Sequence, residues 1–549
     1  MLEKNYPAWG RGLRNGMLAT ALVVCLDYSR TPILAVMSMG FFLFPALLFF
    51  AVTGKLRRAA TISSALAITV YLLERMKAHY YKEPITVSDL YLISDLSNWE
   101  TLLHYPLAGL AVAVLSLILG ASLLSHRMEK TRNVRERAGS FAIALIVALG
   151  MISCRNNLYA SNAWTTSLPK GQGPFANLLF SSRAFDYTPP QVVGNDTLFL
   201  GKAADASRHK REAPSQHPDI IVWLQESTVN PNIYDLPDAR LPELAMFQQN
   251  PNTRAQGMLR VHTFGGSTWL SEFAFFSGLS SRDFAGAADS VYYTVTPHLR
   301  TSLAKVLKAN GYHTVILTPT NKSAYHASSA YRDFGIDEVL QPQDLGFPAD
   351  KAISLWTMES SELAEYAKKI LNRKTDKPIF LFMLTLKEHG PYSANAELFY
   401  GLPNTTLGRR ISDYVNRIEK LSSATEGFSA FLMQRKKPAL FLYFGDHQPN
   451  FENGKSNYKT QIPNAERLTQ FVLRENFNVG SVNTPVFAVT DIAFLGGLIL
   501  EHAGLTPDLL FKANMAMRQL CQGGLQDCPD QKLVESYRHF IYHTLTTAG

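Results

Sequence analysis

Residues 440–449 read LFLYFGDHQP. The unbroken run of apolar and aromatic residues is typical of a strand buried on both faces, and Gly445 ends it. Asp446 and His447 follow directly, so the strand delivers a carboxylate and an imidazole at its carboxyl end. Ligands of parallel sheets collect at that end, and both groups can bind a divalent metal. The alternative is an ordinary turn, in which Asp446 caps the backbone and His447 is merely exposed.

Apolar runs divide the chain into two parts. With 549 residues it is too long for one core, and its first 155 residues are far more apolar than the rest. Extended by flanking residues, five runs can cross a bilayer: Gly12–Leu26, Ile33–Val52, Ala59–Leu73, Leu107–Leu124 and Phe141–Ser153. We predict a transmembrane domain of about five helices at residues 1–155, a linker along the membrane at 156–218 and a soluble domain at 219–549.

Basic residues mark one side of these runs. They precede the first run and lie between the second and third and between the fourth and fifth, for example at Arg14, Arg57 and Arg132. This pattern places the N-terminus in the cytoplasm and, after five spans, the soluble domain outside a bacterial inner membrane. Membrane topology thus explains most of the net charge of +8, and no nucleic-acid partner is expected.

Cys521 and Cys528 flank a short loop that contains two glycines. A disulfide between them is expected in an oxidising compartment such as the periplasm. Two free thiols would instead fit a cytoplasmic tail, which contradicts the distribution of basic residues.

Strand-like and helix-like segments alternate from Asp219 onward. This alternation predicts an α/β domain with a mostly parallel sheet. The expected strands are Ile220–Leu224, His313–Leu317, Ile379–Leu386, Ala439–Phe444 and Val486–Val489. The expected helices are Trp269–Ser277, Leu299–Asn310, Ser360–Leu371, Leu407–Arg435 and Arg467–Leu473.

Three of the expected strands end in acidic or imidazole side chains. Glu226 follows the first strand, Glu388 and His389 follow the third, and Asp446 and His447 follow the fourth. Each alone is compatible with a capped loop, but together they predict a site at one edge of the sheet. Glutamate, aspartate and histidine form a ligand set that suits Zn²⁺ or Mn²⁺.

A candidate nucleophile follows two glycines in the segment 264–273, FGGSTWLSEF. The turn would place the hydroxyl of Ser267 or Thr268 at a helix N-terminus, which favours an anion such as phosphate. Alternatively, one of these residues is an N-cap and Glu272 supports the first turn. A coordinated metal is one way to activate a hydroxyl as a nucleophile.

Several of these motifs together resemble the lipoteichoic acid synthase family of phosphoglycerol transferases. That family belongs to the sulfatase-like branch of the alkaline phosphatase superfamily. The matching segments occur in the family's order over nearly the whole chain: KEPITVSDL at 82–90, Glu226-Ser227, GSTWLSEF at 266–273, TLKEHGP at 385–391 and Gly445-Asp446-His447. The resemblance implies a sulfatase-like catalytic domain at residues 219–549.

The resemblance also implies roles for individual residues. Thr268 corresponds to the nucleophile that carries a covalent phosphoryl intermediate. Glu226, Asp446, His447 and Thr268 correspond to the ligands of one divalent metal, Mn²⁺ or Zn²⁺. His389 corresponds to the histidine that contacts the phosphate or assists the leaving group.

One segment departs from the family pattern. Where the family often carries a Trp-x-Arg pair that binds substrate, residues 324–328 read AYHAS. The guanidinium is missing, so Tyr325 and His326 are expected to take over substrate binding together with His389.

The implied function is transfer of a phosphoglycerol or phosphoethanolamine group. The donor would be phosphatidylglycerol or phosphatidylethanolamine, and the acceptor an extracytoplasmic glycan or lipid. One alternative is a membrane-anchored hydrolase of phosphate or sulfate esters, although a Cys-x-Pro-x-Arg motif for a formylglycine sulfatase is missing. The other alternative is a non-catalytic, ligand-binding member of the fold.

Overall fold

The structure of the protein is a computed structural model in which the chain forms two compact units. It describes residues 32–80, 84–94, 129–159, 173–182, 192–206, 216–348, 357–451, 457–477, 487–526 and 528–545, with a few shorter stretches. The first unit comprises Met1–Asp186 with Ala285–Ala287, and the second comprises Tyr187–Phe284 with Ala288–Gly549.

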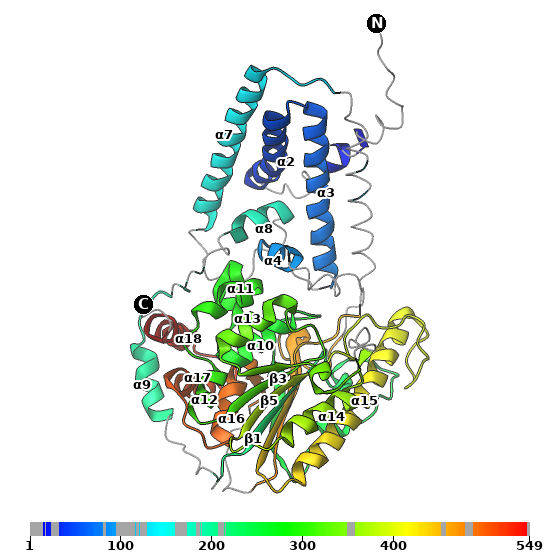
Figure 1. The fold of residues 1–549 in the computed structure, drawn as a ribbon, viewed down its shortest axis with the longest axis vertical. Coiled ribbons are helices and arrows are strands. Elements are labelled where there is room, and N and C mark those ends of the chain that lie inside the picture. Colours follow the sequence, from blue (N-terminus) through cyan, green and yellow to red (C-terminus); the bar gives the residue numbers. More distant parts are fainter. Residues whose placement is uncertain are drawn as a thin grey trace. The chain divides into compact units, whose positions relative to one another are not determined.

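The first unit is helical (Figure 1). Its described helices are α2 (Pro32–Thr53), α3 (Leu56–Tyr80), α4 (Ser88–Ser94), α7 (Val134–Tyr159) and α8 (Pro174–Ser181). Helix α2 packs against both α3 and α7. The Arg137 side chain of α7 donates hydrogen bonds to the carbonyl oxygens of Ala51 and Val52, which satisfies the carboxyl end of α2.

Two of these helices are long and apolar enough to cross a membrane. They are Leu56–His79 within α3 and Val134–Ser153 within α7, whereas α2 contains a shorter apolar stretch, Met37–Thr53. About half of the predicted span Gly12–Leu26 and nearly all of Leu107–Leu124 lie outside the described residues. The five-span arrangement therefore stays a prediction.

A mixed sheet of eight strands forms the centre of the second unit, in the order β4-β3-β5-β1-β6-β7-β2-β8. The strands are β1 (Asp219–Gln225), β2 (Thr253–Arg260), β3 (His313–Leu317), β4 (Glu338–Leu340), β5 (Ile379–Leu384), β6 (Ala439–Gly445), β7 (Leu468–Glu475) and β8 (Val489–Asp491). Five of the seven neighbouring pairs are parallel, and only β7 runs antiparallel to its neighbours. The predicted α/β architecture is thus present in this unit.

Helices cover both faces of this sheet (Figure 1). The α-helices of the second unit are α9 (Thr197–Ala206), α10 (Thr268–Ser277), α11 (Val291–Thr294), α12 (Leu303–Ala309), α13 (Ala327–Phe334), α14 (Ser360–Leu371), α15 (Thr406–Met433), α16 (Leu495–His502), α17 (Leu509–Leu520) and α18 (Gln531–His539). Helices α14 and α15 cover one face, where Trp223 of β1 packs against Phe428 of α15. On the other face, Phe275 of α10 packs against Phe444 of β6. Strands β1 and β6 are therefore buried on both faces, as their continuous apolar runs predict.

One predicted helix is wrong, because residues 467–473 mostly belong to strand β7. Seven of the eight β7 residues are buried, so the alternation that marks a strand is hidden in the sequence. Two further strands were not predicted: β2, whose residues are mostly half-exposed and polar, and the short β4. The predicted strand at Val486–Val489 appears only as β8, at Val489–Asp491.

Cys521 and Cys528 form a disulfide. It links the end of α17 to the segment that precedes α18.

Gly445 allows close packing between the ends of two strands. A Cβ atom at this position would lie 1.7 Å from the carbonyl oxygen of Thr228, in the loop after β1. That distance is far inside van der Waals contact, so any side chain would push the two loops apart. The glycine therefore sets how closely the ends of β1 and β6 approach each other.

We expect Gly445→Ala to lower the free energy of unfolding by about 1–3 kcal/mol, the usual effect of overpacking a core. Urea unfolding of the full chain measures this change. Gly427→Ala is a matched control, because a Cβ there meets nothing within 4 Å on helix α15. Gly427→Ala should raise the free energy of unfolding by about 0.5–1 kcal/mol. If Gly445→Ala and Gly427→Ala have the same free energy of unfolding, the steric argument is contradicted.

Candidate active site and metal centre

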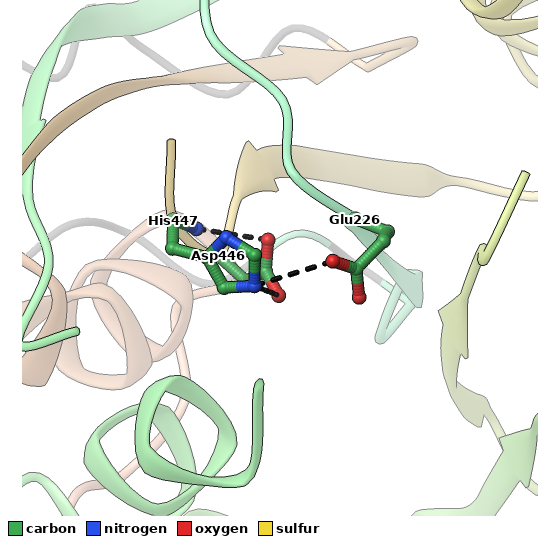
Figure 2. A group of neighbouring side chains, drawn as sticks. All are labelled: Glu226, Asp446 and His447. Carbon is green, nitrogen blue, oxygen red and sulfur yellow. Dashed lines mark hydrogen bonds and ion pairs between the residues drawn. The ribbon is translucent and has the colours of Figure 1, made fainter. Parts of the chain in front are cut away.

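The ends of two neighbouring strands bring three possible metal ligands together. Gln225 and Gly445 are paired across β1 and β6, so Glu226 and Asp446 emerge side by side. The ligand atoms of Glu226, Asp446 and His447 all lie within 4.8 Å of one another, and all three residues are buried. Figure 2 shows the three side chains converging, with His447 Nε2 3.2 Å from Glu226 Oε1 and 3.3 Å from Asp446 Oδ2.

Backbone hydrogen bonds orient two of these groups. Asp446 Oδ1 accepts hydrogen bonds from the backbone N–H groups of Ser227 and His447, each at 2.8 Å. His447 Nδ1 lies 3.0 Å from the carbonyl oxygen of Gln448, to which it donates a hydrogen bond. This contact turns Nε2 toward the two carboxylates, which is the usual way in which a metal-binding histidine is oriented.

Two buried ligand atoms of this cluster have no hydrogen bond, and their chemistry suits a divalent metal. Asp446 Oδ2 and His447 Nε2 are buried and have no hydrogen-bond partner among the described residues. Leaving such atoms unsatisfied is unfavourable, and two carboxylates with one imidazole form a donor set suited to Zn²⁺ or Mn²⁺. A cation among the three side chains would satisfy both atoms.

The three groups strongly perturb each other's pKa values. Burial opposes the charge of Glu226, but the nearby His389 and His447 lower its pKa to about 2. Burial and the charge of Glu226 raise the pKa of Asp446 to about 7. Burial disfavours the imidazolium of His447, yet Asp446 and Glu226 raise its pKa to about 9. The cluster therefore has a high affinity for positive charge, as a metal site requires.

The hydroxyl of Thr268 lies beside this cluster. Thr268 Oγ1 donates a hydrogen bond of 3.1 Å to Glu226 Oε2. Thr268 is the first residue of α10, and Gly265, Gly266 and Ser267 before it all have positive φ angles, which turn the chain sharply into the helix. The structure thus brings together all four residues that the sequence assigns to the metal site, with the hydroxyl at a helix N-terminus.

A second contact fixes α10 against strand β6. Ser271 Oγ donates a hydrogen bond of 2.6 Å to the carbonyl oxygen of Asp446. The helix that positions Thr268 is therefore anchored directly to the loop that carries Asp446 and His447.

His389 lies in the loop after β5 and is partly buried. Its backbone carbonyl accepts a 2.7 Å hydrogen bond from Arg417, and its Nδ1 lies 2.5 Å from the carbonyl oxygen of Gly390. Electrostatic interaction with His389 contributes to the lowered pKa of Glu226.

Of the two aromatic residues predicted to bind substrate, only Tyr325 lines the pocket beside Thr268. The pocket is lined by Thr268, Glu272, Thr318, Thr320, Asn321, Lys322, Tyr325, Ala327, Tyr331, Leu384 and Leu386. Tyr325 stacks on Trp269, with ring centroids 5.1 Å apart. His326 instead stacks on Tyr293 at 4.7 Å. Both residues adopt left-handed backbone angles, with φ of 50° and 68°, a strained conformation that often occurs at functional sites.

Two buried glutamates near the site have no catalytic role in the sequence interpretation. Burial raises the pKa of Glu272 to about 7, although two tyrosine hydroxyls oppose this shift. Burial likewise raises the pKa of Glu388 to about 7, and Ser360 donates a 2.7 Å hydrogen bond to it. The sequence carried one signal for Glu272: it follows Thr268 by four residues and so shares its helix face.

Comparison with known proteins agrees with this geometry. The family model described as Sulfatase matches residues 218–478. An uncharacterized protein of Haemophilus influenzae is 37% identical over 543 residues, which cover 97% of this chain and 98% of that protein. The lipoteichoic acid synthase-like YvgJ of Bacillus subtilis is 23% identical over 421 residues, which cover 71% of this chain and 65% of that protein.

The similarity in fold extends to a solved membrane protein. The integral membrane protein lipooligosaccharide phosphoethanolamine transferase A (EptA) of Neisseria meningitidis has a TM-score of 0.50 and 12% identity, over 92% of this chain and 96% of that one. The Sulfatase match, the extended similarity to relatives and the strand-end site all agree. The chain belongs to the sulfatase-like branch of the alkaline phosphatase superfamily, among the lipoteichoic acid synthase-like proteins.

Proposed function

We propose that the protein is a metal-dependent membrane phosphotransferase. It would move a phosphoglycerol or phosphoethanolamine group from phosphatidylglycerol or phosphatidylethanolamine to an extracytoplasmic glycan or lipid. One observation carries this proposal: the hydroxyl of Thr268 lies at a helix N-terminus and is hydrogen-bonded to Glu226, within a buried carboxylate–imidazole cluster. A nucleophile, an acidic ligand set and an anion-binding helix end therefore meet at one point.

The chemistry would proceed in two displacements at phosphorus. In the first, Thr268 Oγ1 forms a bond to phosphorus, the bond from phosphorus to the diacylglycerol oxygen breaks, and the threonine proton ends on diacylglycerol. In the second, an acceptor hydroxyl forms the new bond to phosphorus, the bond to Thr268 breaks, and the acceptor's proton returns to threonine. His389 would carry these protons.

Glu226, Asp446, His447 and Thr268 would hold one divalent metal, Mn²⁺ or Zn²⁺. When bound, the metal would supply Lewis acidity to the threonine hydroxyl and to a phosphoryl oxygen. Glu226 also accepts the hydrogen bond from Thr268, so it orients the hydroxyl for attack.

A lipid donor would explain why a helical unit precedes the catalytic domain. Two described helices are long and apolar enough to span a bilayer, and the diacylglycerol leaving group would remain in the membrane. The disulfide between Cys521 and Cys528 fits an oxidising compartment. We therefore propose a multi-pass inner-membrane protein with its catalytic domain in the periplasm.

The test uses the full chain in liposomes that contain acyl-labelled phosphatidylglycerol or phosphatidylethanolamine, with Mn²⁺ or Zn²⁺ added. We expect diacylglycerol release from at least one lipid, together with a head-group phosphate adduct on Thr268 by mass spectrometry. Hydrolysis of simple phosphate or sulfate esters, with neither lipid consumed, would instead favour a hydrolase. If the protein neither consumes a lipid nor hydrolyses an ester, the result would point to a non-catalytic member of the fold.

A further inference from the structure

A second cavity lies beside strands β2 and β7. Its volume is about 410 Å³, which falls within the range of about 300–1,000 Å³ that is usual for small-molecule sites. Residues 253–258 of β2, residues 470–472 of β7 and the segment after β1 line it. None of these lining residues belongs to the three-ligand cluster or to the pocket beside Thr268. The cavity is thus large enough for a ligand, and the chemistry described above does not use it.

Four amide side chains line this cavity together with two aromatic rings. The amides are Asn230, Gln249, Gln256 and Gln470, and the rings are Phe247 and Phe471. An amide both donates and accepts hydrogen bonds, as a sugar hydroxyl does, so the two groups can pair in either direction. An aromatic ring adds an apolar face against which the C–H groups of a sugar ring can pack. The combination suits a saccharide.

Two of these amides have unused hydrogen-bonding capacity. Oε1 of Gln256 is buried and has no hydrogen-bond partner among the described residues, which is unfavourable. Gln470 accepts a 2.7 Å hydrogen bond from the backbone N–H of Asn230, but its Nε2 contacts the sulfur of Met258 at 3.5 Å, and a thioether is a weak acceptor. Rotation of the Gln256 amide exchanges its oxygen and nitrogen, so the oxygen can accept from a hydroxyl in the cavity.

The charge of the lining is already balanced. Arg254 is the one charged side chain among the described lining residues, and its Nε lies 3.6 Å from Oε2 of Glu475. Its Nη1 donates a 2.8 Å hydrogen bond to the carbonyl oxygen of Pro251. An anionic ligand would compete with Glu475 for the guanidinium, whereas a neutral, hydroxyl-rich ligand needs no charged partner. The lining therefore favours a neutral sugar over a phosphate or an acidic sugar.

We propose that this cavity binds a neutral sugar residue, whose hydroxyls pair with the amides of Gln256 and Gln470 and whose ring packs against Phe247. Asn230 of the lining follows Glu226 by four positions in the loop after β1, so one loop contributes to this cavity and to the metal site. The sugar would belong to the acceptor glycan, a statement that rests on the proposed transferase function. The inference adds to that function a place and a chemical class for the acceptor.

The test measures binding of neutral trisaccharides of glucose, galactose or N-acetylglucosamine to the full chain in lipid nanodiscs that are free of sugar-based detergents. We expect at least one trisaccharide to bind. Gln256→Met and Gln249→Met should each weaken its binding by roughly 3- to 10-fold, the effect of losing one neutral hydrogen bond. Gln249 is exposed, so its substitution should not disturb the fold.

Gln248→Met is the matched control. Gln248 is the exposed neighbour of Gln249, donates a hydrogen bond to Glu243 and does not line the cavity. Binding of none of the three sugars, or equal weakening in the control, would overturn the inference. Displacement of the bound trisaccharide by inorganic phosphate would also overturn it, since the cavity would then be an anion site.

Thr268→Ala separates this inference from the proposed function. The variant lacks the proposed nucleophile but keeps every lining residue of the cavity, so it should bind the trisaccharide as tightly as the wild type. Sugar binding by a wild type that turns over neither lipid would support the sugar site and contradict the transferase. Lipid turnover by a wild type that binds none of the three sugars would contradict the sugar site and support the transferase.

Discussion

Thr268→Ala is expected to abolish both the covalent adduct and diacylglycerol release. Thr268 is the hydroxyl that lies 3.1 Å from Glu226, and the proposed chemistry has no other nucleophile. The loss in kcat should be at least about 10⁴-fold, as is usual when a nucleophile is removed. Mass spectrometry of the intact protein after incubation with labelled lipid measures the adduct, and lipid extraction measures diacylglycerol.

Thr268→Ser provides the matched control. Serine retains an oxygen at the same helix position but lacks the methyl group that restricts the side-chain rotamer. We expect partial activity, with the adduct on the introduced serine. An alanine variant that still forms the adduct would assign the nucleophile to another residue, such as Ser267.

Asp446→Asn is expected to remove the metal without unfolding the protein. The amide oxygen of the introduced asparagine can still accept the backbone hydrogen bonds of Ser227 and His447, but the charge that faces His447 Nε2 is lost. Metal affinity should fall by at least about 100-fold, since even changes outside the direct ligands reduce affinity 10- to 100-fold. Elemental analysis after dialysis against a fixed concentration of Mn²⁺ or Zn²⁺ measures bound metal directly.

Thermal unfolding provides a second readout for this variant, independent of activity. Metal that binds only the folded state raises Tm, so added Mn²⁺ or Zn²⁺ should raise the Tm of the wild type and not that of Asp446→Asn. Glu365→Gln is a suitable control, because this glutamate is exposed on α14 and pairs only with Lys368 among the described residues. Unchanged metal content in Asp446→Asn would contradict the proposed site.

Buried strands explain why much of the site was predictable. Strands β1 and β6 are apolar along their length because both of their faces are covered, and each ends at a glutamate or an Asp-His pair. In parallel neighbours the carboxyl ends meet at one edge, so Glu226 and Asp446 could be expected to lie close together. Strand β7 was misread for a related reason, because burial on both faces removed the alternation that distinguishes strand from helix.

The positions of Tyr325, His326 and Glu272 around the pocket depend on contacts with residues that are distant in the sequence. Tyr325 and His326 are adjacent, yet Tyr325 stacks on Trp269 in the pocket whereas His326 stacks on Tyr293. Left-handed backbone angles at both positions produce this divergence, and residue type alone does not specify them. Glu272 meets Tyr331, which is 59 positions away.

The sequence by itself determined the helical N-terminal part, the α/β class of the second part and the residues that end its central strands. These features follow from local patterns of apolar residues and from the meeting of parallel strand ends. The tertiary structure decided which of these residues share a pocket, which oxygen of each carboxyl is already hydrogen-bonded and how closely the strand ends approach. The physical reason is that hydrogen bonds and steric contacts act over a few ångströms between segments far apart in the chain, as between Gly445 and Thr228.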